Sequence, residues 1–383
     1  MNITIVAGAR PNFMKIAPLI HAVQRLKDKG ERLKFRLVHT GQHYDPKLSA
    51  TFFDELGIPP PDANLEAGSG TQAEQTAGIM LGFEKELLAH PSDLVIVVGD
   101  VTSTMACSIT AKKLNTKVAH IEAGIRSFDL TMPEEINRMV TDSITDLFFT
   151  TSHFANENLR KAGVPEEKIF FVGNVMIDTL MANRARFIKP PLWNEIGLQE
   201  QGYIVITLHR PNNVDDPDNL QKLLAAISES AGDKKVIFPV HPRTKKVIND
   251  FSHAVPDSLR DRDFVASQLS LQSGHKSMHF VDPMGYLEFN YLVERAFAVI
   301  TDSGGITEET TVMGVPCMTL RNSTERPETC TVGTNELLGT DPAAIKPAME
   351  RLFAGEWKKG GIPELWDGRA AERIVDVLIS GNF

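Results

Sequence analysis

The sequence predicts an α/β protein built from two doubly wound, parallel-sheet domains. Three observations support this: short apolar runs alternate with helical patterns, the chain of 383 residues exceeds one comfortable core, and the alternation is interrupted once near its middle. Strands separated by helices of about ten to fifteen residues form parallel sheets. A chain of this length divides into roughly two domains of about 200 residues each.

The first series of elements occupies the N-terminal half. We expect strands in the runs ITIVAG, LKFRLVH, LVIVVGD, KVAHIEAG, LFFTTS and IFFVGN, with helices over residues 14–29, 45–56, 102–114, 134–145 and 154–162. Between Asp178 and Gln201 the pattern becomes irregular, and Pro190 and Pro191 interrupt it. Residues 1–178 are therefore assigned to a Rossmann-like N-terminal domain.

A second series follows in the C-terminal half. Its strands are expected in YIVITLH, KVIFPVHP, SMHFVDP, FAVITDSGG and VPCMTLR, each followed by a helix or loop. Residues 179–365 therefore form a second Rossmann-like domain. The final residues, 366–383, contain an amphipathic helical pattern.

Composition excludes several classes of function. The formal charge of −9 argues against a nucleic-acid or anionic-membrane surface, because both require a basic face. The three cysteines lack metal-ligand spacing and are interpreted as buried thiols in a reducing compartment. No export signal and no apolar run of about 18 residues is evident, so a soluble, cytoplasmic protein is expected. The histidines form no pair at metal-binding spacing, and no metal is expected.

Three acidic residues stand at or close after the ends of predicted strands. Asp100 follows VIVVGD, Glu122 lies in VAHIEAG, and Glu134 lies in MPEEINR. Carboxylates at the carboxyl ends of parallel strands point into the crevice where open α/β proteins bind ligands. The alternatives are a helix cap for Asp100, and ion pairs with Arg126 or Arg138 for the two glutamates.

The run FAVITDSGG predicts a phosphate site in the second domain. Ser303, Gly304 and Gly305 lie where the strand gives way to a helix, and glycines there let backbone N–H groups approach a diphosphate. Glu309, one turn later, is placed to accept hydrogen bonds from ribose hydroxyls. The alternative is a tight turn that needs glycine for its own geometry.

Basic residues that follow strands strengthen the phosphate interpretation. Guanidinium groups bind phosphate oxygens through two parallel hydrogen bonds. The residues concerned are Arg10, Lys15, Arg321 and Arg326. VAGARPNF is not GxGxxG, and GxxxxGK[ST] is absent, so neither a dinucleotide cofactor nor ATP is indicated, and no cofactor is expected.

Taken together, these segments resemble the UDP-N-acetylglucosamine 2-epimerase family over nearly the whole chain. The resemblance is carried by GARPNFMKIAPL, TGQHYD, VVGDVTST, AHIEAGIRSFD, MPEEINR, VGNVMIDTL, TLHR, PVHP, TDSGGITEE, LRNSTERPE and VGTNELLG. It implies a glycosyltransferase-B-type fold with UDP between two lobes, a C-terminal helix that crosses back onto the first lobe, and a homodimer. It also implies non-hydrolysing interconversion of UDP-GlcNAc and UDP-N-acetylmannosamine.

The resemblance also implies roles for individual residues. The catalytic set comprises Asp100, Glu122, Glu134, Arg138 and His209. Positions that hold UDP are Arg10, Lys15, Phe289, Ser303, Gly304, Gly305, Glu309 and Arg326. Gln42, His43 and His241 resemble part of a regulatory pocket that binds a second UDP-GlcNAc. Asp100 and Glu122 are expected to transfer protons at carbon 2, Glu134 to stabilise charge or assist the opposite-face proton, and His209 to assist the leaving diphosphate.

The sequence departs from the family pattern at several of these sites. Asn212 stands where a glutamate is common, Met284 replaces a glutamine beside the uracil, and Asp45 replaces a glutamine of the regulatory pocket. The GSGTQ stretch also lacks an arginine of the regulated enzymes. A hydrolysing relative that releases N-acetylmannosamine and UDP, a UDP-sugar glycosyltransferase of the same fold, and a non-catalytic nucleotide-sugar sensor remain as alternatives.

Overall fold

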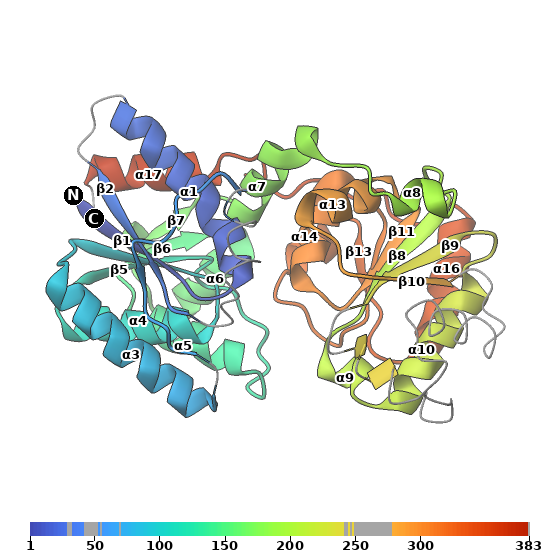
Figure 1. The fold of residues 1–383 in the computed structure, drawn as a ribbon, viewed down its shortest axis with the longest axis horizontal. Coiled ribbons are helices and arrows are strands. Elements are labelled where there is room, and N and C mark those ends of the chain that lie inside the picture. The colour runs from blue at the N-terminus through green and yellow to red at the C-terminus, as the bar shows by residue number, and fades with distance from the viewer. Residues whose placement is uncertain are drawn as a thin grey trace. The chain divides into compact units, whose positions relative to one another are not determined.

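The computed structural model describes residues 1–28, 33–41, 53, 56–68, 70–240, 244–245, 247–248 and 278–381. The chain divides into two compact units, Met1–Ala182 with Glu364–Phe383, and Asn183–Pro363. Each unit is a parallel β-sheet with helices on its faces (Figure 1). The predicted fold class, two doubly wound α/β domains, is confirmed.

The sheet of the first unit has the strand order β3-β2-β1-β4-β5-β6-β7, and all its pairs are parallel. The strands are β1 (Asn2–Ala7), β2 (Lys34–His39), β3 (Ala63–Asn64), β4 (Leu94–Val98), β5 (Lys117–Ile121), β6 (Leu147–Thr150) and β7 (Ile169–Phe171). Every residue of β4 is buried, as expected for a strand with helices on both faces. The order reverses between β1 and β4, and such a switch point is where doubly wound sheets bind ligands.

Helices cover both faces of this sheet. They are α1 (Arg10–Asp28), α3 (Gln72–Ala89), α4 (Thr102–Lys113), α5 (Pro133–Ile144), α6 (His153–Lys161), α7 (Val175–Asn183) and α17 (Ala370–Ser380), with a short 3₁₀ turn at Glu166–Lys168. Figure 1 shows α3, α4 and α5 on one side of the strands and α1 with α17 on the other. The helix expected over 45–56 lies largely outside the described residues.

One long helix was absent from the sequence interpretation. α3 begins after Thr71, whose hydroxyl accepts a hydrogen bond from the Glu74 N–H at 3.2 Å, while the Glu74 carboxylate accepts one from the Thr71 N–H at 2.9 Å. This reciprocal capping box satisfies N–H groups that have no partner inside the helix. Ile79, Phe83 and Leu87 form its buried stripe.

The C-terminal segment packs on the first unit. The Trp366 indole donates a hydrogen bond to the Thr151 carbonyl at 2.9 Å, and α17 packs against α1. The Asp178 carboxylate accepts hydrogen bonds from the N–H groups of Ala370 and Ala371, at 3.0 and 2.7 Å, and so caps α17. Burial outweighs these bonds and raises the pKa of Asp178 to about 6.

The sheet of the second unit has the order β10-β9-β8-β11-β12-β13, again all parallel. The strands are β8 (Tyr203–Thr207), β9 (Lys235–Pro239), β10 (Met278–Val281), β11 (Ala298–Thr301), β12 (Cys317–Thr319) and β13 (Asn335–Leu337). The helices are α8 (Leu192–Glu195), α9 (Pro211–Val214), α10 (Pro217–Ser230), α13 (Tyr286–Arg295), α14 (Gly304–Met313), α15 (Pro327–Thr331) and α16 (Ile345–Phe353), with 3₁₀ turns at Arg184–Arg186 and Pro342–Ala344. Its switch point lies between β8 and β11.

Apolar cores lie on both faces of the second sheet. On one face, Leu223 of α10 and Met349 of α16 pack with Ile206 of β8. On the other, Leu292 of α13 packs with Tyr203 and Val205. The strand β8, which leads to His209, is therefore packed on both faces.

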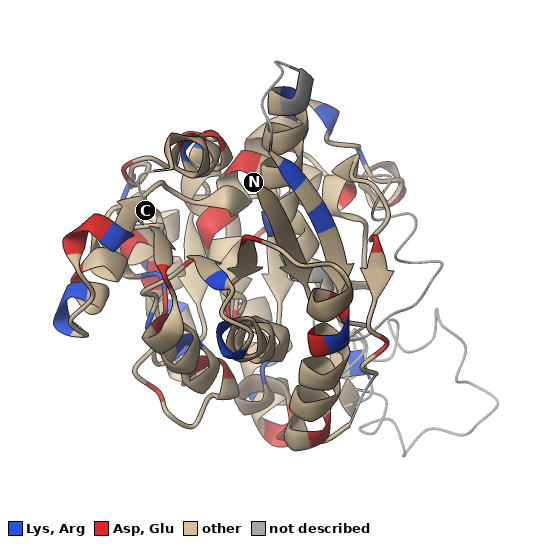
Figure 2. Ribbon diagram, turned by 90° about the vertical axis from the view of Figure 1, so that its left-hand side faces the viewer, with Lys and Arg blue, Asp and Glu red and all other residues tan. Residues whose placement is uncertain are grey.

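Charged residues are distributed through the elements. In the view of Figure 2, acidic and basic residues are interspersed along the helices and strands rather than gathered on one of them. None of the described helices combines the length and apolarity needed to cross a lipid bilayer.

Candidate active site

Asp100 and Glu122 lie on neighbouring loops at the carboxyl edge of the first sheet. Asp100 comes two residues after the end of β4, and Glu122 directly follows β5, the strand paired with β4. Glu122 has a φ of 71°, a left-handed conformation that is costly for a residue with a side chain. Its N–H and that of Ala123 donate to the Phe149 carbonyl at 3.0 and 3.1 Å. Such enforced backbone strain is typical of functional sites.

Lys15 of α1 holds the Glu122 carboxylate. Its ammonium lies 2.6 Å from Glu122 Oε2, and both side chains are largely buried. The side chain of Asn12 fixes the start of α1. Its Oδ1 accepts hydrogen bonds from the Gly8 and Ala9 N–H groups, and its Nδ2 donates to the Val98 carbonyl at 3.3 Å. Lys15, assigned to UDP by resemblance, therefore also contacts a carboxylate assigned to proton transfer.

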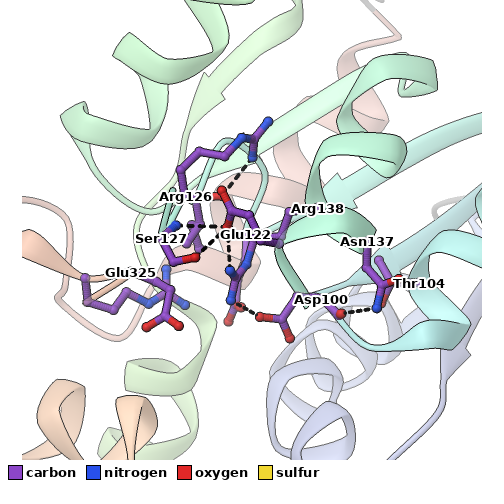
Figure 3. Close-up of polar contacts among 12 residues, drawn as sticks. Asp100, Thr104, Glu122, Arg126, Ser127, Asn137, Arg138 and Glu325 are labelled. Carbon is purple, nitrogen blue, oxygen red and sulfur yellow. Dashed lines mark hydrogen bonds and ion pairs between the residues drawn. The ribbon is translucent and has the colours of Figure 1, made fainter. Parts of the chain in front are cut away.

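Arg138 of α5 holds the Asp100 carboxylate. One guanidinium nitrogen bonds to Asp100 (Figure 3). Another lies 2.8 Å from Glu135 Oε2. The Asn137 amide donates to the backbone carbonyl of Asp100 at 2.9 Å. Glu134 lies in the first turn of the same helix and is half-buried. The beginning of α5 therefore contributes several polar groups to the Asp100 loop.

Glu135 is a site residue that the sequence interpretation passed over. It is almost fully buried, and its carboxylate accepts hydrogen bonds from the Ser127 N–H and hydroxyl and from the Phe128 N–H, at 2.9, 3.0 and 3.1 Å. It thereby connects Arg138 to the loop that follows Glu122. The only sequence signal for it is the second glutamate of MPEEINR.

Arg126 pairs with a different acid from the ones considered from the sequence. Its guanidinium lies 2.7 Å from Asp142 Oδ2 of α5. The same carboxylate accepts from the Gly124 N–H at 3.0 Å and lies 2.7 Å from His120 Nδ1. Burial opposes ionisation of Asp142, but His120 and Arg126 outweigh it and lower the pKa of Asp142. This buried cluster was not anticipated either.

In the second unit, His209 and Asp302 lie beside each other at the switch point. The imidazole Nδ1 is 2.8 Å from Asp302 Oδ1, and Asp302 is fully buried while His209 is 35% exposed. The same carboxylate accepts from the N–H groups of His209 and Arg210 and from the Asn213 amide. Burial opposes ionisation of Asp302, but these partners, with His209 first, lower its pKa. The pair directs Nε2, the other ring nitrogen, away from Asp302.

The Ser303 to Gly305 turn leads into α14. Neither glycine has a left-handed φ, and a Cβ added to Gly305 would meet no atom within 4 Å. A Cβ on Gly304 would meet only the Arg321 guanidinium, at 4.0 Å. The turn therefore does not need glycine for its backbone or packing, which contradicts the alternative considered from the sequence. The glycines leave the N-terminal N–H groups of α14 uncovered.

Glu309 of α14 is buried beside a second carboxylate. The Tyr286 hydroxyl donates to its Oε1 at 2.8 Å, and the neighbouring Glu308 pairs with Arg326. Burial first, and then the charge of Glu308, raise the pKa of Glu309 to about 7. Arg326 thus contacts a carboxylate within its own unit.

Five predicted site residues remain to be placed. Phe289 of α13 is half-buried and packs on the core beneath that helix, and Arg10 is the first residue of α1. Gln42, His43 and His241 lie outside the described residues. Within the described ranges, no group of three His, Cys, Asp or Glu side chains is arranged to hold a metal ion.

Known proteins resemble this chain along its whole length. Residues 24–379 match the family model described as UDP-N-acetylglucosamine 2-epimerase. The chain is 37% identical to a UDP-N-acetylglucosamine 2-epimerase of Methanocaldococcus jannaschii, over 100% of both chains. It is 38% identical to a UDP-2,3-diacetamido-2,3-dideoxy-D-glucuronate 2-epimerase of Pseudomonas aeruginosa, over 99% of each. A crystal structure of the Methanocaldococcus jannaschii UDP-GlcNAc 2-epimerase in complex with UDP-GlcNAc and UDP matches with a TM-score of 0.84, at 38% identity and 100% coverage of both chains.

Proposed function

Because this chain belongs to the UDP-N-acetylglucosamine 2-epimerase family, we propose that it interconverts UDP-GlcNAc and UDP-N-acetylmannosamine by inverting carbon 2, without net hydrolysis. The observation that carries the proposal is the pairing of Asp100 with Arg138 and of Glu122 with Lys15, on the adjacent loops that follow β4 and β5 at the carboxyl edge of the first sheet. Two carboxylates held by cations at such an edge suit proton transfer to and from a bound sugar.

The substrate chemistry explains why acids and cations are both required. The carbon 2 hydrogen is too weakly acidic for simple removal, because no carbonyl adjoins that carbon. In an elimination, a carboxylate takes this proton, the C2–H electrons form a C1=C2 double bond, and the C1–O bond electrons leave with UDP. The intermediates are 2-acetamidoglucal and UDP. Readdition of UDP to carbon 1 and of a proton to carbon 2 from the opposite face completes the inversion.

In this scheme, residues of the first unit carry out the chemistry on the sugar ring. Asp100 and Glu122 transfer the carbon 2 protons, and Glu134 at the start of α5 stabilises positive charge that develops on the ring or assists the opposite-face proton. Arg138 orients Asp100 through the contact described above. The strained backbone of Glu122 supports its assignment to chemistry rather than packing.

Residues of the second unit bind the departing UDP. The N–H groups at the start of α14 and the hydroxyl of Ser303 are donors for diphosphate oxygens, and Gly305 gives them room. His209, held by Asp302, donates to the developing charge on the leaving group. Glu309 accepts from the ribose hydroxyls. All of these donors and acceptors belong to the second unit.

A second substrate is favoured by one specific observation. The Pseudomonas aeruginosa relative is as similar to this chain as the Methanocaldococcus jannaschii enzyme, yet its name specifies a diacetamido glucuronate sugar. That name describes the same inversion at carbon 2 on a ring that also carries a second acetamido group and a carboxylate. Comparing kcat/KM for the two UDP-sugars decides between them, and a higher value for the uronate would replace UDP-GlcNAc as the substrate.

Product analysis tests the proposal. The protein is incubated with UDP-GlcNAc, and the sugar products are resolved by NMR. We expect a mixture of UDP-GlcNAc and UDP-N-acetylmannosamine that is stable with time. Accumulation of free N-acetylmannosamine and UDP would mean that water replaces UDP in the second step, and transfer of the sugar to an added acceptor would mean a glycosyltransferase.

A further inference from the structure

A buried, hydrogen-bonded histidine–aspartate pair lies next to the two loops that carry Asp100 and Glu122. His120, the fourth residue of β5, is fully buried, and its Nδ1 lies 2.7 Å from Asp142 Oδ1. Its Nε2 lies 2.8 Å from the backbone carbonyl of Gly99. Neither His120 nor Asp142 belongs to the set of groups proposed above to contact the substrate.

The hydrogen-bond partners define how this pair is held. A carbonyl oxygen only accepts, so His120 Nε2 carries a proton that it donates to Gly99. Asp142 Oδ2 receives the Gly124 N–H and the Arg126 guanidinium and therefore carries no proton itself. With Arg126 beside it, Asp142 is held as a carboxylate that accepts hydrogen bonds. The ring of His120 is therefore anchored at both nitrogens, to the Gly99 carbonyl and to the Asp142 carboxylate.

The two ends of this pair meet the backbone next to the two reacting acids. Gly99, whose carbonyl receives Nε2–H, directly precedes Asp100, and its own N–H donates to the Ile121 carbonyl at 3.0 Å. Gly124, whose N–H donates to Asp142, lies two residues after Glu122. Since His120 itself lies two residues before Glu122, the pair connects the β4 loop with both sides of the β5 loop.

We propose that His120 and Asp142 are positioning residues that fix the Asp100 and Glu122 loops relative to each other, so that both carboxylates reach carbon 2 from set directions. This inference rests on the proposed function, because it concerns the same reaction. Proton removal and return on opposite faces require two acids at a defined separation, and small displacements of reacting groups are costly in rate. A buried histidine and carboxylate that are hydrogen-bonded to each other and to both loops resist such displacement better than a single hydrogen bond does.

The variants His120→Gln and Asp142→Asn test this role. The glutamine amide would keep a donor for the Gly99 carbonyl without the ring that also reaches Asp142, and the asparagine would keep the shape of the aspartate side chain without its charge. We expect kcat to fall roughly 100-fold while KM and UDP affinity stay near those of the unaltered protein. The matched control is His153→Gln, which removes another histidine paired with a carboxylate, Glu364, on the exposed surface of the same unit.

A double-mutant comparison separates positioning from general loss of structure. If His120 and Asp142 act only through their contact with each other, the double variant should lose no more activity than either single variant. In an Asp100→Asn background, His120→Gln should cost little further activity, because the acid it positions is already absent. Additive losses in both comparisons, or equal losses in the His153→Gln control, would overturn the proposal.

NMR of the unaltered protein tests the pair without any assay of turnover. With ¹⁵N-labelled histidine, Nε2 of His120 should carry a proton that is hydrogen-bonded to the Gly99 carbonyl. An unprotonated Nε2 would overturn the inference even if the protein is an active epimerase. Conversely, a protein with this Nε2–H and no activity on either UDP-sugar would contradict the proposed function, not the geometry of the pair. Should His120→Gln not fold, Asp142→Asn and this spectrum carry the test.

Discussion

His209 Nδ1 lies 2.8 Å from Asp302 Oδ1, across the ends of two neighbouring strands of the second sheet. The first unit holds a comparable pair, His120 with Asp142, that is almost completely buried. In both cases a carboxylate fixes the orientation of an imidazole. The exposure of His209 allows it to contact a ligand, whereas the burial of His120 restricts it to the protein itself.

The Asp302→Asn variant should impair turnover through His209. The substituted amide carries no charge to hold the imidazole, and part of it would face the N–H groups of His209 and Arg210. We expect kcat to fall by about 100-fold, in the range of a lost general acid, with UDP affinity retained. Glu336→Gln, which alters a partly exposed pair with Arg351 in the same unit, should leave kcat unchanged. Loss of UDP binding together with turnover would show that Asp302 supports the fold of the site instead.

Asp100→Asn and Glu122→Gln should each retain UDP binding and lose turnover. Their carboxylates are assigned to proton transfer, so removing either one should lower kcat by at least about 100-fold. Calorimetric titration with UDP and thermal unfolding check binding and fold. The control Glu166→Gln changes an exposed ion pair with Arg160. If both acids prove dispensable for turnover, the assignment is wrong, and if the variants unfold, the acids are structural.

Gly305→Ala should weaken UDP binding without weakening the fold. A methyl group there meets no protein atom within 4 Å, and alanine is the better helix former by up to about 1 kcal/mol. We therefore expect an unchanged or slightly higher Tm, but a Kd for UDP that rises at least about tenfold, or ~1.4 kcal/mol. Gly361→Ala is the matched control, because its Cβ would make only ordinary contacts from 3.8 Å. Equal UDP affinity in both variants would exclude close approach of diphosphate to this turn.

Glu309 should make the stability of the protein depend on pH. Its pKa is raised from 4.5 to about 7 in the folded state, so the folded protein binds this proton more tightly than the unfolded chain. The resulting stabilisation is complete below about pH 4.5 and is lost as the pH rises through about 7. Glu309→Gln should remove this pH-dependent loss in the free energy of unfolding, which amounts to at most on the order of 3 kcal/mol.

Chemical unfolding at pH 5 and pH 8 checks this prediction. The Glu309→Gln variant should gain stability relative to the unaltered protein at pH 8, while its UDP affinity decreases because the ribose loses an ionised acceptor. The exposed Glu229→Gln on α10 serves as the control. A pH profile of stability identical to that of the unaltered protein would contradict the burial argument.

The fold followed from the sequence because apolar strands and helical spacers in a parallel sheet repeat in chain order. The helix α3 was absent from the sequence interpretation, although the Thr71 to Glu74 capping box was a readable signal for its start. The positions of Asp100, Glu122 and His209 at strand ends were also predictable from local pattern. Their partners were not.

The ion-pair and hydrogen-bond partners of these residues depend on which strands become neighbours in the sheet. The local sequence pattern does not define that order. Arg126 was considered as a partner of Glu122 or Glu134, but it pairs with Asp142, sixteen positions further along the chain, as counted on the sequence. Lys15 reaches Glu122 only because β1 and β5 lie on either side of β4. His120 and Asp302 gave no sequence signal beyond their place near a strand end.

The most direct test of the central claim is the fate of the carbon 2 hydrogen. The protein is incubated with UDP-GlcNAc in deuterated water, and the recovered UDP-sugars are examined by NMR and mass spectrometry. Elimination and readdition predict deuterium at carbon 2 in both UDP-GlcNAc and UDP-N-acetylmannosamine. Recovery of UDP-sugars that keep their original hydrogen at carbon 2 would contradict the mechanism and the roles assigned to Asp100 and Glu122.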